Sequence, residues 1–297
     1  MNAAAELARP RLRHHEPMAR HTSWRVGGPA DVYFEPQNLP ELQAFLAELP
    51  TGTPLLWVGL GSNLLVRDGG FRGAVVSLGK GFAGIAPIDE RTLSAGAAVP
   101  CAKVAQQLGR LGLAGGEFLA GIPGTVGGAL AMNAGAHGGE TWQRVRAAQT
   151  IDRAGTLHRR TPADYCIAYR SVEGPADEWF IGAEFSFEPA DAESVQAAIH
   201  ALLRRRAATQ PLRQANAGSV FRNPPGDHAA RLIEAAGLKG LTVGKAQVST
   251  VHANFIVNLG GARAADIETL IDTLQQRVEA AFGVRLEPEV RRVGEAA

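Results

Sequence analysis

The segment Ala215–Pro224 contains Ser219, which follows an Ala-Gly pair and has neighbours that would suit a proton donor. An aromatic residue, a cation, an amide and a proline come within the next five positions. Such a loop can hold one hydroxyl rigidly while its polar neighbours bind a charged ligand. Ser219 is not in a G-x-S-x-G turn and has no recognisable Asp–His partner, which disfavours a serine hydrolase. A held and polarised hydroxyl can instead donate a proton.

An arginine and a pair of glutamates could complete such a site. Arg170 follows Tyr169, and a guanidinium fork can polarise a carboxylate or an enolate oxygen. Glu287 and Glu289 would share one face of a strand, so that one of them could point into a cleft. Taken alone, these motifs are also explained by a surface arginine and a solvated edge strand.

Two glycine clusters have the composition of loops that lie against a ligand. The first is Gly59-Leu60-Gly61-Ser62-Asn63 and stands between two apolar strands. Its main-chain N–H groups could converge on an anion, with the Ser62 and Asn63 side chains as further donors. A third glycine is missing and a strand rather than a helix follows, so it is not a Rossmann fingerprint. A plain hairpin turn remains the alternative.

The second cluster is longer and runs from Gly121 to Ala129. Its small residues would let a flat ligand lie against the backbone, although a tightly packed helix start would have the same composition. Two such different loops fit an elongated cofactor between strands better than a simple phosphate ligand. The residues predicted to bind this cofactor are Gly59, Gly61, Ser62, Asn63, Gly121, Pro123, Gly124, Thr125, Gly127 and Gly128.

Composition argues against several other classes of protein. The 30 Lys and Arg residues balance 29 Asp and Glu residues, and this net charge of +1 gives no support to a role at nucleic acid or a membrane surface. No apolar run approaches the roughly 18 residues of a membrane helix, and residues 1–20 are basic without the apolar core of a secretory signal. We therefore expect a cytoplasmic protein. The spacing of histidines predicts no metal site, and Cys101 and Cys166 are expected to be small, half-buried hydrophobic residues.

The hydrophobic pattern predicts three successive units of strands and helices that position these residues. The expected helices span residues 40–49, 100–110, 192–209, 228–236 and 263–282. Asp227 is the expected N-cap of the fourth helix, and Val284–Val293 has the pattern of a last strand that could return to any of the units. The predicted domains comprise residues 1–80 joined by 284–297, residues 81–205, and residues 206–283.

These blocks occur in an order that resembles the UDP-N-acetylenolpyruvoylglucosamine reductase (MurB) family of flavoenzymes. The matching segments are His21–Ala30, both glycine clusters, Asn216–Pro224, Gln247–Asn258 and Glu287–Arg291. The resemblance implies a mixed α/β (α+β) fold, in which a two-subdomain FAD-binding domain of the vanillyl-alcohol-oxidase (PCMH) type joins a smaller α/β substrate-binding domain. It also implies non-covalent FAD, NADPH as the reductant and a nucleotide-sugar substrate. We expect a monomer.

The resemblance further implies roles for single residues. Ser219 matches the family's proton donor, Arg170 its catalytic arginine and Glu289 its catalytic glutamate. The candidates for contact with the substrate are Arg222, which stands where a lysine is more usual, Asn223 and Lys239. The short connection before the Ser219 loop leaves no room for the substrate-covering loop of one branch, which indicates the shorter, second type. The residue that clamps the substrate diphosphate is left open.

Two other functions are compatible with parts of the sequence. A related FAD-dependent oxidase or dehydrogenase of a hydroxy acid or sugar would share the glycine clusters without needing Ser219 or Glu289. A non-catalytic flavin- or nucleotide-binding module would need none of the three candidate catalytic residues, and their joint presence argues against it.

Overall fold

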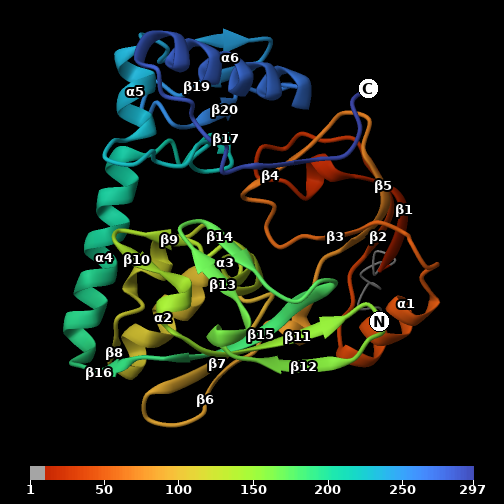
Figure 1. The fold of residues 1–297 in the computed structure, drawn as a ribbon. Coiled ribbons are helices and arrows are strands. Elements are labelled where there is room, and N and C mark those ends of the chain that lie inside the picture. Colours follow the sequence, from red (N-terminus) through yellow and green to blue (C-terminus); the bar gives the residue numbers. More distant parts are fainter. Residues whose placement is uncertain (1–10) are drawn as a thin grey trace, which may run out of the picture.

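The chain folds into three units that pack against one another, and helix α4 (Ala192–Thr209) runs along one side of the molecule from the second unit to the third (Figure 1). The computed structural model describes residues 11–297. The first ten residues, with Arg9 of the basic segment, lie outside the described residues. None of the helices within 11–297 is long and apolar enough to cross a membrane.

The first unit is a mixed sheet with one crossover helix. Its strands lie in the order β1–β2–β5–β3, with β1 antiparallel to β2 and the other neighbours parallel. They are β1 (Leu12–Pro17), β2 (Pro29–Phe34), β3 (Leu55–Trp57) and β5 (Phe71–Val76). Helix α1 (Leu39–Glu48) begins after Asn38, whose side chain accepts a hydrogen bond from the Glu41 N–H, and it buries Leu42 and Leu46.

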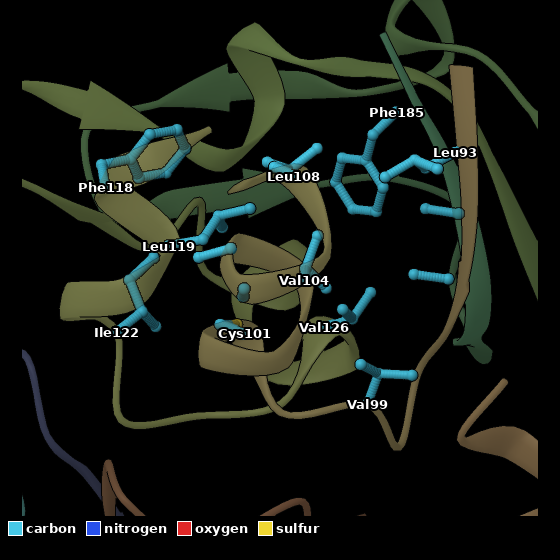
Figure 2. Close-up of a cluster of buried hydrophobic side chains, with 14 of the residues drawn as sticks. Leu93, Val99, Cys101, Val104, Leu108, Phe118, Leu119, Ile122, Val126 and Phe185 are labelled. Atoms are coloured by element: carbon cyan, nitrogen blue, oxygen red, sulfur yellow. The ribbon is translucent and has the colours of Figure 1, made fainter. Parts of the chain in front are cut away.

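The second unit is built on an antiparallel sheet with the order β12–β11–β15–β7–β6. Its strands are β6 (Ile85–Pro87), β7 (Thr92–Gly96), β11 (Val145–Asp152), β12 (Leu157–Arg160) and β15 (Glu178–Ser186). Helices α2 (Cys101–Leu111) and α3 (Val126–Ala131) contribute to its core, where Val104 and Leu108 of α2 lie with Phe185 of the sheet (Figure 2). Val126, Ala129 and Leu130 of α3 are buried in the same core, so the second glycine cluster, which leads into α3, lies on this sheet.

Short strand pairs extend this second unit. The pairs are β8 (Leu113–Ala114) with β16 (Glu188–Pro189), β9 (Gly135–Ala136) with β10 (Gly139–Glu140), and β13 (Cys166–Ala168) with β14 (Ser171–Glu173). The turn between β13 and β14 consists of only two residues, Tyr169 and Arg170. This hairpin therefore presents Arg170 at its tip.

The third unit combines a small antiparallel sheet with two helices. Its strands, in the order β17–β20–β19–β18, are Ala215–Asn216, Ile256–Asn258, Ala246–Val248 and Thr242–Val243. Helix α5 (Ala229–Ala235) precedes the sheet's middle strands, and α6 (Ala264–Phe282) follows them and ends at Gly283 in the left-handed conformation. The apolar residues of α6 at helical spacing are all buried, as the sequence pattern predicts: Ile267, Leu270, Ile271, Leu274 and Val278.

The first and third units share a core. Trp24 of the first unit is fully buried among side chains of the third, and its Nε1 donates to the Ile256 carbonyl oxygen at 2.7 Å. Asn258 Nδ2 donates back to the Trp24 carbonyl oxygen at 2.9 Å. Asp68, also from the first unit, accepts the N–H groups of the first two residues of α6, each at 2.9 Å. A carboxylate from a distant segment therefore caps this helix.

The expected N-cap of α5 is wrong. The helix begins at Ala229 with His228 at the N-cap position. Asp227 instead pairs with Arg231, and the Ala229 N–H donates to Asn223 Oδ1 at 3.1 Å. An acceptor six residues upstream thus replaces the local cap, because the Pro-Pro-Gly turn brings Asn223 back to the helix start.

The long last strand expected at residues 284–293 is also mostly absent. Only β21 (Arg291–Val293) forms, and it pairs in parallel with β4 (Leu64–Val66) of the first unit. The residues before it contact the Ser219 loop instead, which interrupts a regular strand. The proposed domain boundary between residues 205 and 206 lies inside α4, and the domain boundaries stay a prediction.

The two cysteines differ from each other. Cys101 is buried at the start of α2, where burial raises the pKa of its thiol to about 12 (Figure 2). Cys166 is exposed on β13, so the expectation that it is half-buried is wrong. The short hairpin β13–β14 explains the difference, because a two-stranded pair covers few of its side chains.

Candidate active site and cofactor cleft

Arg170 has an unusual backbone conformation, and its side chain donates to main-chain carbonyl oxygens. Its φ is 55°, in the left-handed region that costs a non-glycine residue about 1–3 kcal/mol. Its Nη2 donates to the Gly135 carbonyl oxygen at 2.7 Å and its Nη1 to that of Asn133 at 3.3 Å. A strained residue held in this way is typical of a functional site, where the position of a side chain matters more than a low conformational energy.

Asn133 stabilises this arrangement through hydrogen bonds to neighbouring segments. It is buried, and its Nδ2 donates to the carbonyl oxygen of Ala168 at 3.0 Å and to Glu140 Oε2 at 2.9 Å. Its Oδ1 accepts the Trp142 N–H at 3.1 Å. One side chain therefore ties the β13–β14 hairpin to the β9–β10 hairpin. The sequence gives no signal for this role beyond an asparagine at the end of a run of small residues.

Glu289 meets Arg170 at the centre of the site. Arg170 Nε and Glu289 Oε1 are 3.1 Å apart, and the two side chains are only 14% and 15% exposed. Burial raises the pKa of Glu289, and this effect outweighs the attraction of Arg170 and Arg222, which lowers it. The Glu287 side chain is 74% exposed. The structure thus selects Glu289 from the pair as the one that faces inward.

The Ser219 loop is fastened to the segment that carries Glu289. Gly218, at φ 73°, donates its N–H to Asn216 Oδ1 at 3.0 Å and forms the turn before the serine. The carbonyl oxygen of Val220, the residue after Ser219, accepts the Glu289 N–H at 2.8 Å. The structure therefore places Ser219 one residue from a direct main-chain contact with Glu289.

A second buried asparagine fixes this loop. Asn254 Oδ1 accepts the Phe221 N–H at 3.0 Å, while its Nδ2 donates to the Phe221 carbonyl oxygen at 2.8 Å. The same residue's carbonyl oxygen accepts the Val220 N–H at 2.9 Å. Asn254 was not among the predicted site residues, since its partners lie more than thirty positions away in the sequence.

The three candidate substrate contacts lie in different surroundings. Arg222 is half-buried beside the site, and its Nη2 donates to the Arg170 carbonyl oxygen at 3.0 Å. Asn223 follows it and caps α5 through its Oδ1. Lys239 lies after α5, and its ammonium group is 3.0 Å from Glu234 Oε1. Only Arg222 has a direct contact with a candidate catalytic residue among these hydrogen bonds and ion pairs.

A cleft of about 390 Å³ separates the first unit from the second. Its walls include Gly59 from the first glycine cluster and Thr125, Gly127 and Gly128 from the second. A Cβ added at Gly59 would lie 2.4 Å from Thr125 Oγ1, so the two clusters approach as closely as glycine allows. Thr125 is also the N-cap of α3, because its side chain accepts the Gly128 N–H.

The other predicted cofactor residues adjoin this cleft or bind protein. Gly61, at φ 61°, lies against the His21 carbonyl oxygen, which a Cβ would approach to 2.1 Å. Asn63 Nδ2 donates to the Glu289 carbonyl oxygen at 3.0 Å, which links the first cluster to the segment of this candidate catalytic residue. The remaining four lie along the start of the second cluster or face it: Ser62 and Gly124, which are neighbours, Gly121, which abuts His137, and Pro123, which is exposed.

Aromatic rings and buried polar atoms without partners line the cleft. Trp57 and Trp179, which both line the cavity, stack on each other with ring centroids 5.2 Å apart. Two buried polar atoms of lining residues, Trp57 Nε1 and the Tyr165 hydroxyl, have no hydrogen-bond partner within residues 11–297. Burial raises the pKa of Tyr165 to about 12, so this hydroxyl keeps its proton. Glycine walls and unpaired polar atoms together fit a flat, polar cofactor.

Comparisons with known proteins identify both halves of this arrangement. A family model described as "FAD binding domain" matches residues 30–161, and one described as "UDP-N-acetylenolpyruvoylglucosamine reductase, C-terminal domain" matches residues 210–293. The UDP-N-acetylenolpyruvoylglucosamine reductase of Alkalilimnicola ehrlichii is 57% identical over the whole of this chain and 99% of its own length. The chain belongs to the UDP-N-acetylenolpyruvoylglucosamine reductase family. Its reaction is therefore the reduction of the sugar nucleotide UDP-N-acetylenolpyruvoylglucosamine in peptidoglycan precursor synthesis.

Further relatives agree with this assignment. The reductase of Methylococcus capsulatus is 56% identical, over 95% of this chain and 93% of its own. The crystal structure of the MurB reductase from Thermus caldophilus superposes with a TM-score of 0.83 at 34% identity, over 95% of this chain and all of that one. The family, the fold class and the FAD cofactor predicted from the sequence are confirmed. A length of 297 residues fits the family's shorter, second type.

Proposed function

We propose that this reductase transfers a hydride from FAD, previously reduced by NADPH, to the enolpyruvyl group of its substrate, with Arg170, Glu289 and Ser219 at the reacting centre. The product is UDP-N-acetylmuramate. The observation that supports this proposal most is the contact between Arg170 and Glu289, which lies beside the main chain of the Ser219 loop. Three segments far apart in the sequence thus converge on one point.

The roles of these residues follow from where charge develops. When bound, FAD would supply the hydride, from its N5 atom to C3 of the enolpyruvyl group. Negative charge then builds toward C2 and the adjoining carboxylate. The guanidinium of Arg170 is fixed by main-chain carbonyls before the substrate arrives, so it can stabilise this charge without reorganising. Ser219 donates its proton to C2, which completes the addition of a hydride and a proton across the double bond.

Glu289 can assist as an acid or as a hydrogen-bond donor. Because burial raises the pKa of its carboxyl group, more of it carries a proton at a given pH than an ordinary glutamic acid would. A protonated carboxyl group next to a developing enolate can donate a hydrogen bond to it. An ionised carboxylate would instead repel the charge.

The cleft between the first and second units is the proposed FAD site. Gly59 and Gly127 let the backbone approach the cofactor, because neither carries a side chain that would fill the cleft. Ser62 and Thr125 offer hydroxyl groups next to these backbones, while Trp57 can cover a ring. Substrate contact is proposed for Arg222, Asn223 and Lys239, although Lys239 would first have to leave Glu234.

The test is an anaerobic titration that follows flavin absorbance. Purified protein should be yellow, lose its colour with NADPH and recover it when the enolpyruvyl sugar nucleotide is added. The variant Ser219→Ala should still be bleached by NADPH at the wild-type rate. Its turnover should fall by about two to four orders of magnitude, because only the proton transfer to C2 is lost.

Three outcomes would contradict the proposal in different ways. Protein that neither contains nor binds flavin would contradict the cofactor and the reaction together. Flavin that a hydroxy acid reduces, but the enolpyruvyl substrate does not reoxidise, would favour a related oxidase or dehydrogenase. Normal turnover of the Ser219→Ala variant would remove Ser219 as the proton donor and leave the overall reaction intact.

We also propose that the protein acts in the cytoplasm as a monomer. A nucleotide-sugar substrate and NADPH as reductant both support that location. Size-exclusion chromatography with light scattering would test the oligomeric state.

A further inference from the structure

Arg222 connects the two segments that carry the proposed catalytic residues. It lies three residues after Ser219 on the same loop, and its Nη2 donates to the carbonyl oxygen of Arg170 at 3.0 Å. Arg170 is the turn residue with φ 55°. The Arg222 side chain therefore binds the main chain at the strained position from which the catalytic guanidinium projects.

The base of Arg222 is itself fixed to the Glu289 segment. Its N–H donates to the Glu287 carbonyl oxygen at 2.9 Å, and the preceding residue, Phe221, forms a bridge with Pro288. With the main chain held on one side and Nη2 bound on the other, the side chain spans from the Ser219 loop to the β13–β14 turn. A lysine ammonium group acts as a point charge and does not need this geometry. A guanidinium that donates to one particular carbonyl oxygen does need it.

We propose that Arg222 is a positioning residue, which fixes Arg170 and Ser219 relative to each other by holding the β13–β14 turn against the Ser219 loop. This inference rests on the proposed function of those two residues. It assigns Arg222 a role different from contact with the substrate, and the two roles predict different kinetics. A displacement of a reacting group by about 1 Å can cost about 100-fold in rate, so one well-placed hydrogen bond can matter.

Arg222 also influences the charge of Glu289. The charged groups around Glu289 are Arg170 at 3.1 Å, Arg222 on the Ser219 loop, Glu287 on its own segment, and Glu140, which reaches it through Arg170. Arg222 is one of the two cations that lower the pKa of Glu289 against the effect of burial. Removing its charge should therefore move the pKa of Glu289 upward, whereas a lysine, which keeps the charge, should leave it unchanged.

The test compares Arg222→Met, Arg222→Lys and the wild-type holoenzyme in the two half-reactions. Reduction of the flavin by NADPH should be unchanged in both variants. Reoxidation by saturating enolpyruvyl substrate should slow by about 10- to 100-fold in Arg222→Met, with a smaller change in KM. Arg222→Lys should recover part of this rate, and the pH profile of reoxidation should shift to higher pH in Arg222→Met but not in Arg222→Lys. Arg277→Met, which removes an exposed arginine on α6, is the matched control.

Each other outcome overturns the inference. A wild-type rate of reoxidation in Arg222→Met shows that the contact does not position the site. A raised KM with an unchanged rate at saturation assigns Arg222 to substrate contact. An equal loss in both half-reactions, with a lowered melting temperature, shows a purely structural role. Ser219→Ala in the same assay distinguishes failure of this inference from failure of the proposed function. Normal reoxidation in that variant contradicts the proposed function itself.

Discussion

Two residues at the centre of the site exist in states that they would not adopt alone. Arg170 has a left-handed backbone, and Glu289 has a carboxyl group whose pKa is raised by burial. Contacts with distant segments hold both residues in place. The guanidinium of Arg170 donates to main-chain carbonyl oxygens, and the Val220 carbonyl oxygen accepts the Glu289 N–H. The free energy that this strain costs is supplied by the rest of the fold.

The pH dependence of substrate reduction should report on Glu289. If its protonated form assists the reaction, the rate of flavin reoxidation falls as pH rises through its pKa. Because that pKa is raised, this fall should lie above the usual range of a glutamic acid. In Glu289→Gln the rate should drop by about 100-fold, and this pH limb should disappear, because the amide does not titrate.

Stopped-flow reoxidation across the acidic to neutral range is the measurement. Glu279→Gln serves as the control, since that exposed side chain on α6 pairs with Arg285 and should leave the profile unchanged. A Glu289→Gln enzyme that retained the wild-type pH limb would assign the titration to another group.

At the scale of elements, the sequence predicts individual helices and loops better than it predicts the contacts between them. Helical periodicity predicts α6 and α4 closely, and glycine-rich composition singles out two segments whose residues line one cleft. The N-cap of α5 was missed because the Asn223 acceptor arrives from an irregular turn. Asn133 and Asn254 are not predicted for another reason: Asn133 bonds to Ala168 and Asn254 to Phe221, each more than thirty positions away. Hydrogen bonds between distant segments leave no periodic signal in the chain.

The contact between the two glycine clusters gives a prediction about cofactor affinity. In Gly59→Ala the new methyl group would lie 2.4 Å from Thr125 Oγ1, so either the loop or the N-cap of α3 must move. Overpacking of this kind costs about 1–3 kcal/mol. If the displacement reaches the FAD site, the dissociation constant of FAD should rise by about tenfold or more.

The ratio of flavin to protein absorbance and a fluorescence titration of the apoprotein with FAD would measure this. Gly84→Ala is the control, because a Cβ there meets nothing within 4 Å. Unchanged FAD affinity in Gly59→Ala would place the cofactor away from this contact.

At the scale of the whole molecule, the third unit is fastened to the first rather than tethered by a linker. Trp24 enters its core, and Asp68 caps α6. An ion pair between Arg67 and Glu268, 2.8 Å apart and partly exposed, lies next to this cap. Such a pair contributes at most about 1 kcal/mol, whereas a helix cap contributes about 0.5–2 kcal/mol. The cap and the buried tryptophan therefore dominate the joint.

Asp68→Ala should weaken this joint measurably. It removes the acceptor for two N–H groups at the start of α6, and we expect a loss of about 1–2 kcal/mol in the free energy of unfolding. The midpoint of urea denaturation of the holoenzyme should fall. Glu279→Ala, which removes an exposed partner of Arg285 near the end of α6, should change the midpoint little. Equal midpoints for Asp68→Ala and the wild type would contradict the importance of the cap.

The pairing of β4 with β21 has a consequence for biosynthesis. All three residues of β4 are buried in the finished protein, yet their partner strand ends at residue 293 of 297. A growing chain on the ribosome must therefore carry this apolar segment unpaired until β21 has been synthesised. Non-local pairing of this kind is slow to form and leaves an unpaired segment open to aggregation. The amount of active reductase in a cell should depend on how well chaperones cover residues 64–66 during that interval.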